Sequence, residues 1–192
     1  MQGTTLKGKR ARLRPITEEV DLPILYKWRN NLDSLYLWSV RRYPVTFDEF
    51  TEEFRHDLET DKHVQMIIES NSTKEPVGAI YSYDVNFIDG YCFVTIYVDS
   101  PYVRKGYGAE ALPLFVNYLF TYFNFYKIYM EVYGYNDISI SGIQKAGFLE
   151  EGNFKEHRLY DGKRHNMLRF ALYRNRLPYI RKFIGRLTKS TK

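Results

Sequence analysis

The segment that most constrains the fold is Val103-Arg104-Lys105-Gly106-Tyr107-Gly108-Ala109. It follows alternating apolar residues over 91–98, which predict a strand, and precedes apolar residues at helical spacing over 112–122. A turn that opens a helix leaves the N–H groups of the first helical turn free, and the helix dipole favours an anion there. Glycine lets the backbone approach a phosphate without an intervening Cβ. The sequence therefore predicts a phosphate-binding loop between a sheet and a helix.

Two widespread phosphate-binding loops do not fit this segment. A Walker A loop requires Gly-Lys-Ser/Thr, which is absent here, and a dinucleotide fingerprint requires a third glycine where this chain has Ala111. No strand–helix–strand unit of the dinucleotide-binding type follows. Arg104 and Lys105 add positive charge beside the two glycines. The loop is thus expected to hold a phosphate-bearing ligand of another class.

The remainder of the chain predicts one mixed α/β domain. Strands are expected over 9–14, 64–69, 76–83, 91–98, 127–133, 148–160 and 165–173. Helices are expected after Thr17, after Thr46, after Gly108 and between Asn136 and Gly147. Asp-Gly pairs at 89–90 and 161–162 indicate hairpins, so the strands should be mostly antiparallel. The expected fold is a central, mostly antiparallel sheet flanked by about four helices.

Charge divides the chain into a nearly neutral domain, 1–173, and a basic tail, 174–192. The tail carries seven Lys or Arg and no acidic residue, whereas the whole chain has a net charge of +5. No domain-wide nucleic-acid footprint is therefore expected. Ile180, Phe183, Ile184 and Leu187 would share one side of a helix in the tail. Such a helix either packs on its own domain, which we favour, or lies on a membrane or an acidic partner.

The single cysteine, Cys92, excludes an internal disulfide and a metal site built on cysteines. Histidines 56, 63, 157 and 165 lack close metal-ligand spacing, so we expect no metal. We see no signal-peptide pattern over 1–9 and no apolar run long enough to span a membrane. A cytoplasmic location is the resulting expectation.

Two ordered motifs resemble those of the GNAT superfamily of N-acetyltransferases. The coenzyme A loop of that family is Gln/Arg-x-x-Gly-x-Gly/Ala, and residues 103–108 match it except for Val103. The segment Asn136-x-x-Ser139 through Lys145-Ala146-Gly147-Phe148 is similar to a later family helix. Leu13-Arg14-Pro15, Trp28-Arg29-Asn30 and 155–163 resemble the branch that acetylates the N-termini of ribosomal proteins. The likeness covers residues 9–173 and implies a splayed sheet with acetyl-CoA as co-substrate.

The resemblance also implies roles for individual residues. Residues Val103, Arg104, Lys105, Gly106, Tyr107, Gly108 and Ala109 would hold the coenzyme, together with Asn136 and Ser139. A backbone N–H from Ile96, Tyr97 or Val98 would polarise the thioester carbonyl. Ser139 is the candidate proton donor to the sulfur, because Ile143 stands where many relatives have a tyrosine acid.

The general base is less specified than the coenzyme loop. Glu131 lies within an expected strand beside the coenzyme cleft and is the leading candidate, although such a carboxylate commonly pairs with a neighbouring strand. Asp84, Glu69, His157 and His165 are further candidates, and a nucleophilic role for Cys92 is not favoured.

The expected activity is transfer of an acetyl group from acetyl-CoA to a primary amine. An aromatic content of 17% suits a small-molecule acceptor such as an amino sugar, an aminoglycoside or a polyamine. The motif likeness instead points to a protein N-terminus as acceptor. A non-catalytic acyl-CoA-binding module is a second class, and an adaptor acting through the tail is a third. We expect a monomer or a homodimer, with no nucleic-acid partner.

Overall fold

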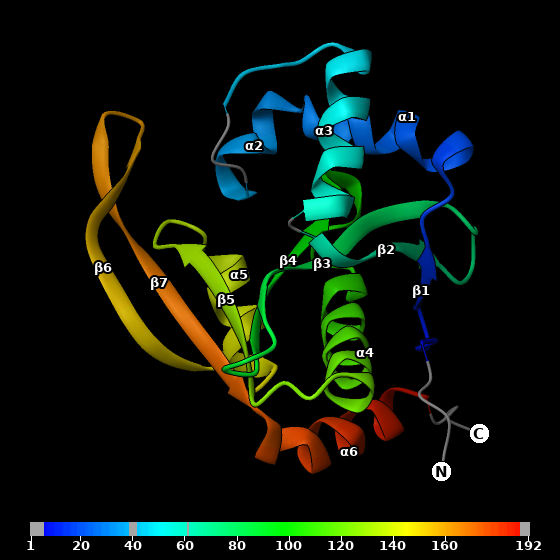
Figure 1. Cartoon of the computed structure of the whole chain (residues 1–192), viewed down its shortest axis with the longest axis vertical. Helices are drawn as coiled ribbons and strands as arrows, with labels where there is room; N and C mark the ends of the chain where they lie inside the picture. Colours follow the sequence, from blue (N-terminus) through cyan, green and yellow to red (C-terminus); the bar gives the residue numbers. More distant parts are fainter. Residues whose placement is uncertain (1–5, 39–41, 61, 189–192) are drawn as a thin grey trace.

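The computed structural model describes residues 6–38, 42–60 and 62–188, and its seven strands form one sheet in the order β1-β2-β3-β4-β5-β7-β6 (Figure 1). The strands are β1 (Ala11–Pro15), β2 (Lys62–Ser70), β3 (Pro76–Asn86), β4 (Tyr91–Val98), β5 (Lys127–Tyr133), β6 (Leu149–Tyr160) and β7 (Lys163–Tyr173). The helices are α1 (Glu18–Arg29), α2 (Leu32–Trp38), α3 (Phe47–Thr60), α4 (Tyr107–Tyr122), α5 (Asp137–Lys145) and α6 (Leu177–Thr188). All neighbouring strands are antiparallel except the pair β4 and β5. The mixed α/β domain with a mostly antiparallel sheet is confirmed.

Local sequence signals account for several element ends. Thr46 and Glu49 form the expected capping box: the Thr46 N–H donates to Glu49 Oε2 at 2.7 Å, and the Glu49 N–H donates to Thr46 Oγ1 at 3.3 Å. Asp161 and Gly162 take φ of 49° and 69°, the left-handed values that a two-residue hairpin turn requires. These contacts fix where α3 begins and where the β6–β7 hairpin turns.

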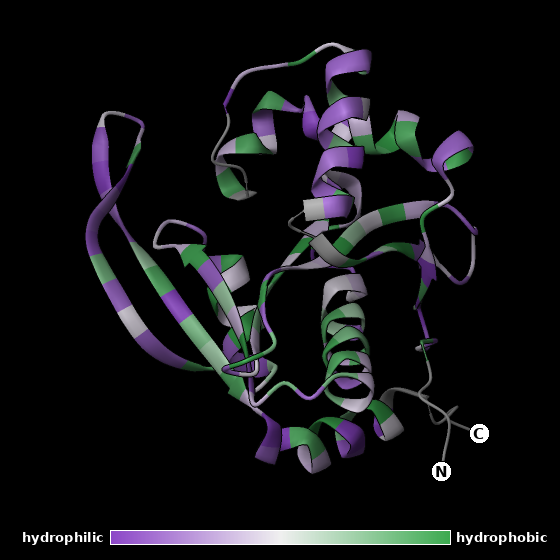
Figure 2. Ribbon diagram, in the orientation of Figure 1, coloured by the Kyte–Doolittle hydropathy of each residue, from purple (hydrophilic) through white to green (hydrophobic). Residues whose placement is uncertain are grey.

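The main core lies between the sheet and α4, on what we call the back face. Alternate residues of β4 and β5, including Val94, Met130 and Val132, point into this core. They meet fully buried residues of α4 such as Phe115 and Leu119. Figure 2 shows α4 as largely hydrophobic, in keeping with a helix that buries most of its circumference. This packing fixes α4 against the strands that flank the predicted loop.

The opposite, front face is covered in part by α1, α2 and α3. Trp28 of α1 packs against Ile67 of β2 and Tyr97 of β4, and its ring centre lies 5.4 Å from that of Tyr97. Leu22 of α1 packs with Phe50 and Phe54 of α3 in a separate small core. The helices α1–α3 thus cap one end of the molecule, opposite to α6 (Figure 1).

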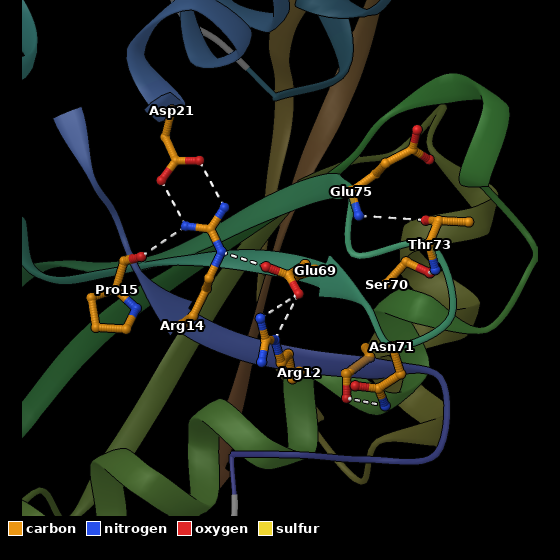
Figure 3. Close-up of polar contacts among 10 residues, drawn as sticks. Arg12, Arg14, Pro15, Asp21, Glu69, Ser70, Asn71, Thr73 and Glu75 are labelled. Atoms are coloured by element: carbon orange, nitrogen blue, oxygen red, sulfur yellow. Dashed lines mark hydrogen bonds and ion pairs between the residues drawn. The ribbon is translucent and has the colours of Figure 1, made fainter. Parts of the chain in front are cut away.

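A buried charge network ties α1 to the edge of the sheet (Figure 3). Glu69 Oε1 and Oε2 accept hydrogen bonds from Arg12 Nε at 2.7 Å and Arg14 Nε at 2.6 Å, and Arg14 also binds both oxygens of Asp21. Burial opposes the ionised forms of Glu69 and Asp21, but these hydrogen bonds outweigh it and lower the pKa of both carboxyls. The same Asp21 contacts raise the pKa of Arg14 above its ordinary value. Each buried charge therefore has a partner, as buried charges require.

The C-terminal segment forms α6 and packs on α4. Ile180 and Ile184 are 1% and 5% exposed and belong to the main core, while Lys182 and Arg186 are exposed. Through residue 188 the segment is therefore packed on the domain; residues 189–192 and the side chain of Leu187 lie outside the described part. The described chain has six α-helices, which include the helix expected in the tail, α6, and the short α2. None of its helices is long and apolar enough to cross a membrane.

Candidate active site

The sheet opens between β4 and β5, which confirms the splayed arrangement. Their pairing is limited to Tyr91–Lys127, Cys92–Ile128 and Phe93–Tyr129. Beyond these pairs β4 remains bonded to β3 through Val98, and β5 remains bonded to β7 through Tyr133. The second halves of β4 and β5 therefore diverge and leave a gap in the ladder (Figure 1).

The register of β4 determines which backbone groups face this gap. The Asp99 N–H donates to the Val77 carbonyl at 2.9 Å, so Asp99 points its backbone groups towards β3. Backbone groups alternate along a strand with a period of two. The N–H groups of Ile96 and Val98 consequently face the gap, whereas that of Tyr97 faces β3. Of the three residues named from the sequence, Ile96 and Val98 have the orientation that a carbonyl in the gap would need.

The predicted glycine loop does open α4. Gly106 is the N-cap residue with φ of +88°, a left-handed value that glycine adopts without strain, and its carbonyl accepts the Glu110 N–H at 3.2 Å. The N–H groups of Tyr107, Gly108 and Ala109 precede the first intrahelical bonds of α4 and are free for an anion. The loop therefore has the backbone geometry of a phosphate site.

The glycine loop and the strand gap are continuous. A Cβ built on Gly108 would lie 3.5 Å from Val98 Cγ2 and 3.7 Å from Ile96 Cδ1, so the first turn of α4 abuts the end of β4. Val103 is half-buried and its N–H is bound to the Ser100 carbonyl at 3.3 Å, while the side chains of Arg104 and Lys105 are exposed. A phosphate at the loop and an acyl group in the gap can thus belong to one extended ligand.

Helix α5 lies beside β5 on the back face. Asn136 is its N-cap, as expected, and Asn136 Oδ1 accepts the Ser139 N–H at 3.2 Å. Ile143, which stands where many relatives have a tyrosine acid, is 4% exposed and packs in the main core. It offers no hydroxyl as a proton donor. Ser139 is half-buried in the first turn of α5. It is the hydroxyl that the sequence analysis named as the candidate proton donor.

Glu131 lies on the opposite, front face of β5. It is paired with Arg169 of β7, whose Nε and Nη2 donate to Glu131 Oε1 at 2.9 and 2.6 Å. The Arg169 guanidinium lies 5.0 Å from the ring centre of Phe93 and 5.2 Å from that of Phe154. Glu131 and the α5 hydroxyls therefore flank β5 from opposite sides.

The structure gives the other candidate residues different surroundings. Glu69 is held in the Arg12–Arg14 network at the far edge of the sheet, and Asp84 is an exposed residue with φ of 47°. His165 packs edge-on against the Tyr135 ring at 4.9 Å. Burial raises the pKa of the Cys92 thiol to about 12, so this buried residue is not a thiolate nucleophile near neutral pH.

An aromatic surface that was not predicted from the sequence lies beside the Glu131–Arg169 pair. The rings of Phe93 and Tyr129 stack with centres 5.0 Å apart, and Tyr83 lies 5.6 Å from Phe93. Burial raises the pKa of the Tyr83 hydroxyl far above its ordinary value, so it stays neutral. These residues occupy alternate positions of β3, β4 and β5, and that alternation is the signal from which a shared face could have been derived.

Metal ligands do not gather at this site. Within residues 6–38, 42–60 and 62–188, no three His, Cys, Asp or Glu side chains are grouped so that they could hold a metal ion. The described residues at the site offer backbone N–H donors, a carboxylate and hydroxyls.

Comparison with known proteins identifies the family. Residues 10–149 match the acetyltransferase (GNAT) domain family. The chain belongs to the GNAT acetyltransferases. It uses acetyl-CoA to acetylate an amine, and the loop and gap described above fit a coenzyme that carries phosphates at one end and a thioester at the other.

Two curated relatives and one solved structure illustrate this GNAT membership. The spermidine N(1)-acetyltransferase of Vibrio cholerae is 23% identical over 159 residues, covering 83% of this chain and 91% of that protein. The enzyme of that name from Escherichia coli K12 is 24% identical over 164 residues, covering 85% and 86%. A crystal structure of Vibrio cholerae spermidine N-acetyltransferase with CoA and spermine superposes with a TM-score of 0.80 at 22% identity, covering 88% of this chain and 98% of the other.

These relatives correct one expectation about the branch. The sequence motifs pointed to enzymes that acetylate the N-termini of ribosomal proteins, whereas the relatives described above are spermidine acetyltransferases. The motifs used for that assignment lie in β1, α1 and the β6–β7 hairpin. They include Arg14, which the structure places in the Glu69–Asp21 charge network, so this residue has a structural role in this chain.

Proposed function

We propose that this GNAT enzyme acetylates a primary amine of a small polycation such as a polyamine. The observation that carries the proposal is the front face of the strand gap, where the Glu131–Arg169 pair lies beside the rings of Phe93 and Tyr129, with Tyr83 next to Phe93. Carboxylates and aromatic faces both attract ammonium groups. The names of the relatives support the same acceptor class.

The coenzyme would be held at the back of the gap. Acetyl-CoA supplies the acetyl group as a thioester. The free N–H groups of Tyr107, Gly108 and Ala109 would bind phosphate oxygens, with Val103, Arg104, Lys105 and Gly106 shaping the turn. The N–H of Ile96 or Val98 would donate to the carbonyl oxygen, a backbone donor that costs no reorganisation during the reaction.

Glu131 is the proposed general base. Because both Arg169 donors converge on Oε1, the second oxygen, Oε2, can take a proton from an incoming ammonium group directly or through a water molecule. Ser139 is the proposed proton donor to the sulfur, with Asn136 holding the first turn of α5 in place. A thiol with a pKa of about 8.5 leaves readily enough that this donor is helpful rather than essential.

The test is an acceptor panel with the purified enzyme and acetyl-CoA. Thiol release and acetylated product would be measured with spermidine, spermine, an aminoglycoside, an amino sugar and a short peptide with a free N-terminus. The proposal expects the largest kcat/KM for a polyamine. A larger value for the peptide would replace it with protein N-terminal acetylation, and coenzyme binding without turnover on any amine would leave an acyl-CoA-binding module.

The same preparation would show how many copies assemble. We expected a monomer or a homodimer from the sequence, whereas a Vibrio cholerae spermidine N-acetyltransferase of TM-score 0.74 forms a dodecamer. We therefore include larger assemblies in the proposal, and light scattering coupled to size-exclusion chromatography distinguishes them.

A further inference from the structure

The side chain of Arg10 reaches the coenzyme loop from the other end of the chain. Its Nη1 donates to the Lys105 carbonyl at 3.3 Å. A Cβ built on Gly106 would lie 2.5 Å from the same nitrogen. The guanidinium therefore lies beside Gly106, the N-cap of α4.

The backbone at Arg10 is fixed there independently of its side chain. Glu110, in the first turn of α4, is 5% exposed, and its Oε2 accepts the N–H groups of Arg10 at 2.7 Å and Ala11 at 3.1 Å. A Cβ on Gly8 would lie 2.5 Å from that oxygen, so the chain passes close to the carboxylate. Removing the Arg10 side chain consequently leaves the contact between the start of β1 and α4 intact.

The charge of Arg10 has no ion-pair partner among the residues that the structure describes. Arg12 and Arg14, the next two arginines along the chain, are paired with Glu69 and Asp21. Arg10 is exposed and has no ion pair with any described residue of the chain. An unpaired guanidinium beside a helix N-terminus provides a forked donor for a phosphate.

We propose that Arg10 binds the pyrophosphate of acetyl-CoA and supplies the side-chain donor that Val103 cannot. The inference rests on the proposed binding of the coenzyme at residues 103–109. Val103 occupies the motif position where the family has Gln or Arg, and it is apolar. Arg10 stands 93 positions earlier in the sequence, yet its guanidinium lies beside the N-cap glycine of the same loop.

The experiment compares wild type, Arg10→Gln, Arg10→Lys and Lys163→Gln by isothermal titration calorimetry. Lys163, an exposed residue at the β6–β7 turn, controls for the loss of one positive charge. CoA and dephospho-CoA are titrated in parallel, because dephospho-CoA retains the pyrophosphate and lacks the 3′-phosphate. Circular dichroism and thermal unfolding without ligand check that each variant is folded.

The inference predicts that Arg10→Gln lowers the affinity for both ligands by about tenfold to a hundredfold, the range for the loss of a hydrogen bond to a charged group. Arg10→Lys should recover part of the loss, and Lys163→Gln should bind as wild type does. Unchanged affinity in folded Arg10→Gln, with tight binding by wild type, would overturn the inference alone. A loss confined to CoA would also overturn it, because Arg10 would then contact the 3′-phosphate. If wild type binds neither ligand, the coenzyme assignment fails and the inference fails with it.

Discussion

Arg169 directs two N–H groups at a single carboxylate oxygen of Glu131, Oε1, from distances of 2.9 and 2.6 Å. A fork that used both oxygens would leave neither carboxylate oxygen fully available, whereas this arrangement orients the carboxylate and leaves Oε2 for an amine. The guanidinium is itself positioned by the rings of Phe93 and Phe154. The pair thus joins β5 and β7 at the front of the strand gap.

Glu131→Gln should therefore lower kcat on a polyamine by about 10²–10⁴-fold, the usual contribution of a general base, and leave acetyl-CoA affinity unchanged. Steady-state kinetics and a coenzyme titration measure the two quantities separately. The matched control is Glu150→Gln, an exposed carboxylate on β6. If kcat is retained in Glu131→Gln, the base is another group and Glu131 serves the strand pairing.

Arg174 caps the C-terminal end of α4 and the loop after it. Its guanidinium donates to the Phe120 carbonyl at 2.8 Å and to the carbonyls of Phe123 and Phe125, and burial lowers its pKa. Arg174→Ala should cost about 2–4 kcal/mol of unfolding free energy, because three carbonyls lose a charged donor. Urea unfolding measures the loss, with Arg176→Ala, an exposed neighbour, expected within about 0.5 kcal/mol of wild type.

The Glu69–Asp21 network should make the free energy of unfolding fall at acid pH. Both carboxyls have pKa values lowered in the folded state from ordinary values of 4.5 and 3.8, so their contribution is complete above those values. It is lost as the pH falls through the lower folded-state values. Unfolding free energies measured between about pH 7 and about pH 2 should fall steeply at the acid end.

Glu69→Gln tests the origin of that fall. The variant should be less stable than wild type near neutral pH, since it leaves Arg12 and Arg14 without a carboxylate partner. It should also lose less stability on acidification. An identical acid slope in wild type and variant would assign the pH dependence to other carboxyls.

Helix α6 should contribute to the stability of the folded domain. Ile180→Ala removes a side chain that is 1% exposed and should cost about 2–4 kcal/mol, whereas Tyr179→Ala, at a 51% exposed position, should cost much less. Chemical denaturation compares the two variants. Equal, small effects would indicate that the segment after Arg174 is a detachable tail.

Local signals made much of the fold predictable. The strands at 91–98 and 127–133 were predicted with the observed bounds, as was the α5 helix between Asn136 and Gly147, because alternation and capping residues act over a few positions. The short α2 was missed: seven residues after Asn30-Asn31 give too little periodicity for a prediction. Where its residues pack depends on tertiary contacts, such as the stacking of Tyr36 on Tyr160.

The site was predictable where it is contiguous in sequence and not where it is assembled from distant strands. Gly106 and Gly108 identified the anion loop, since backbone geometry there is set by neighbouring residues. The partnership of Glu131 with Arg169 and the approach of Arg10 to Gly106 depend on strand register across 38 and 96 positions. The proposed roles of these residues, including Ser139, remain predictions until variants are assayed.

The most direct measurement is the thermal unfolding of wild type and Gly108→Glu with and without acetyl-CoA. A Cβ at Gly108 has ordinary contact distances to Val98 and Ile96, so the variant should fold while its side chain adds bulk and negative charge between the loop and the end of β4. Gly185→Glu in α6, where a Cβ meets open space, is the matched control. A ligand at a hundredfold excess over Kd stabilises the folded state by about 2.7 kcal/mol. We predict a clear rise in Tm for wild type and Gly185→Glu and none for Gly108→Glu; an equal rise in all three would show that the coenzyme binds elsewhere and contradict the account.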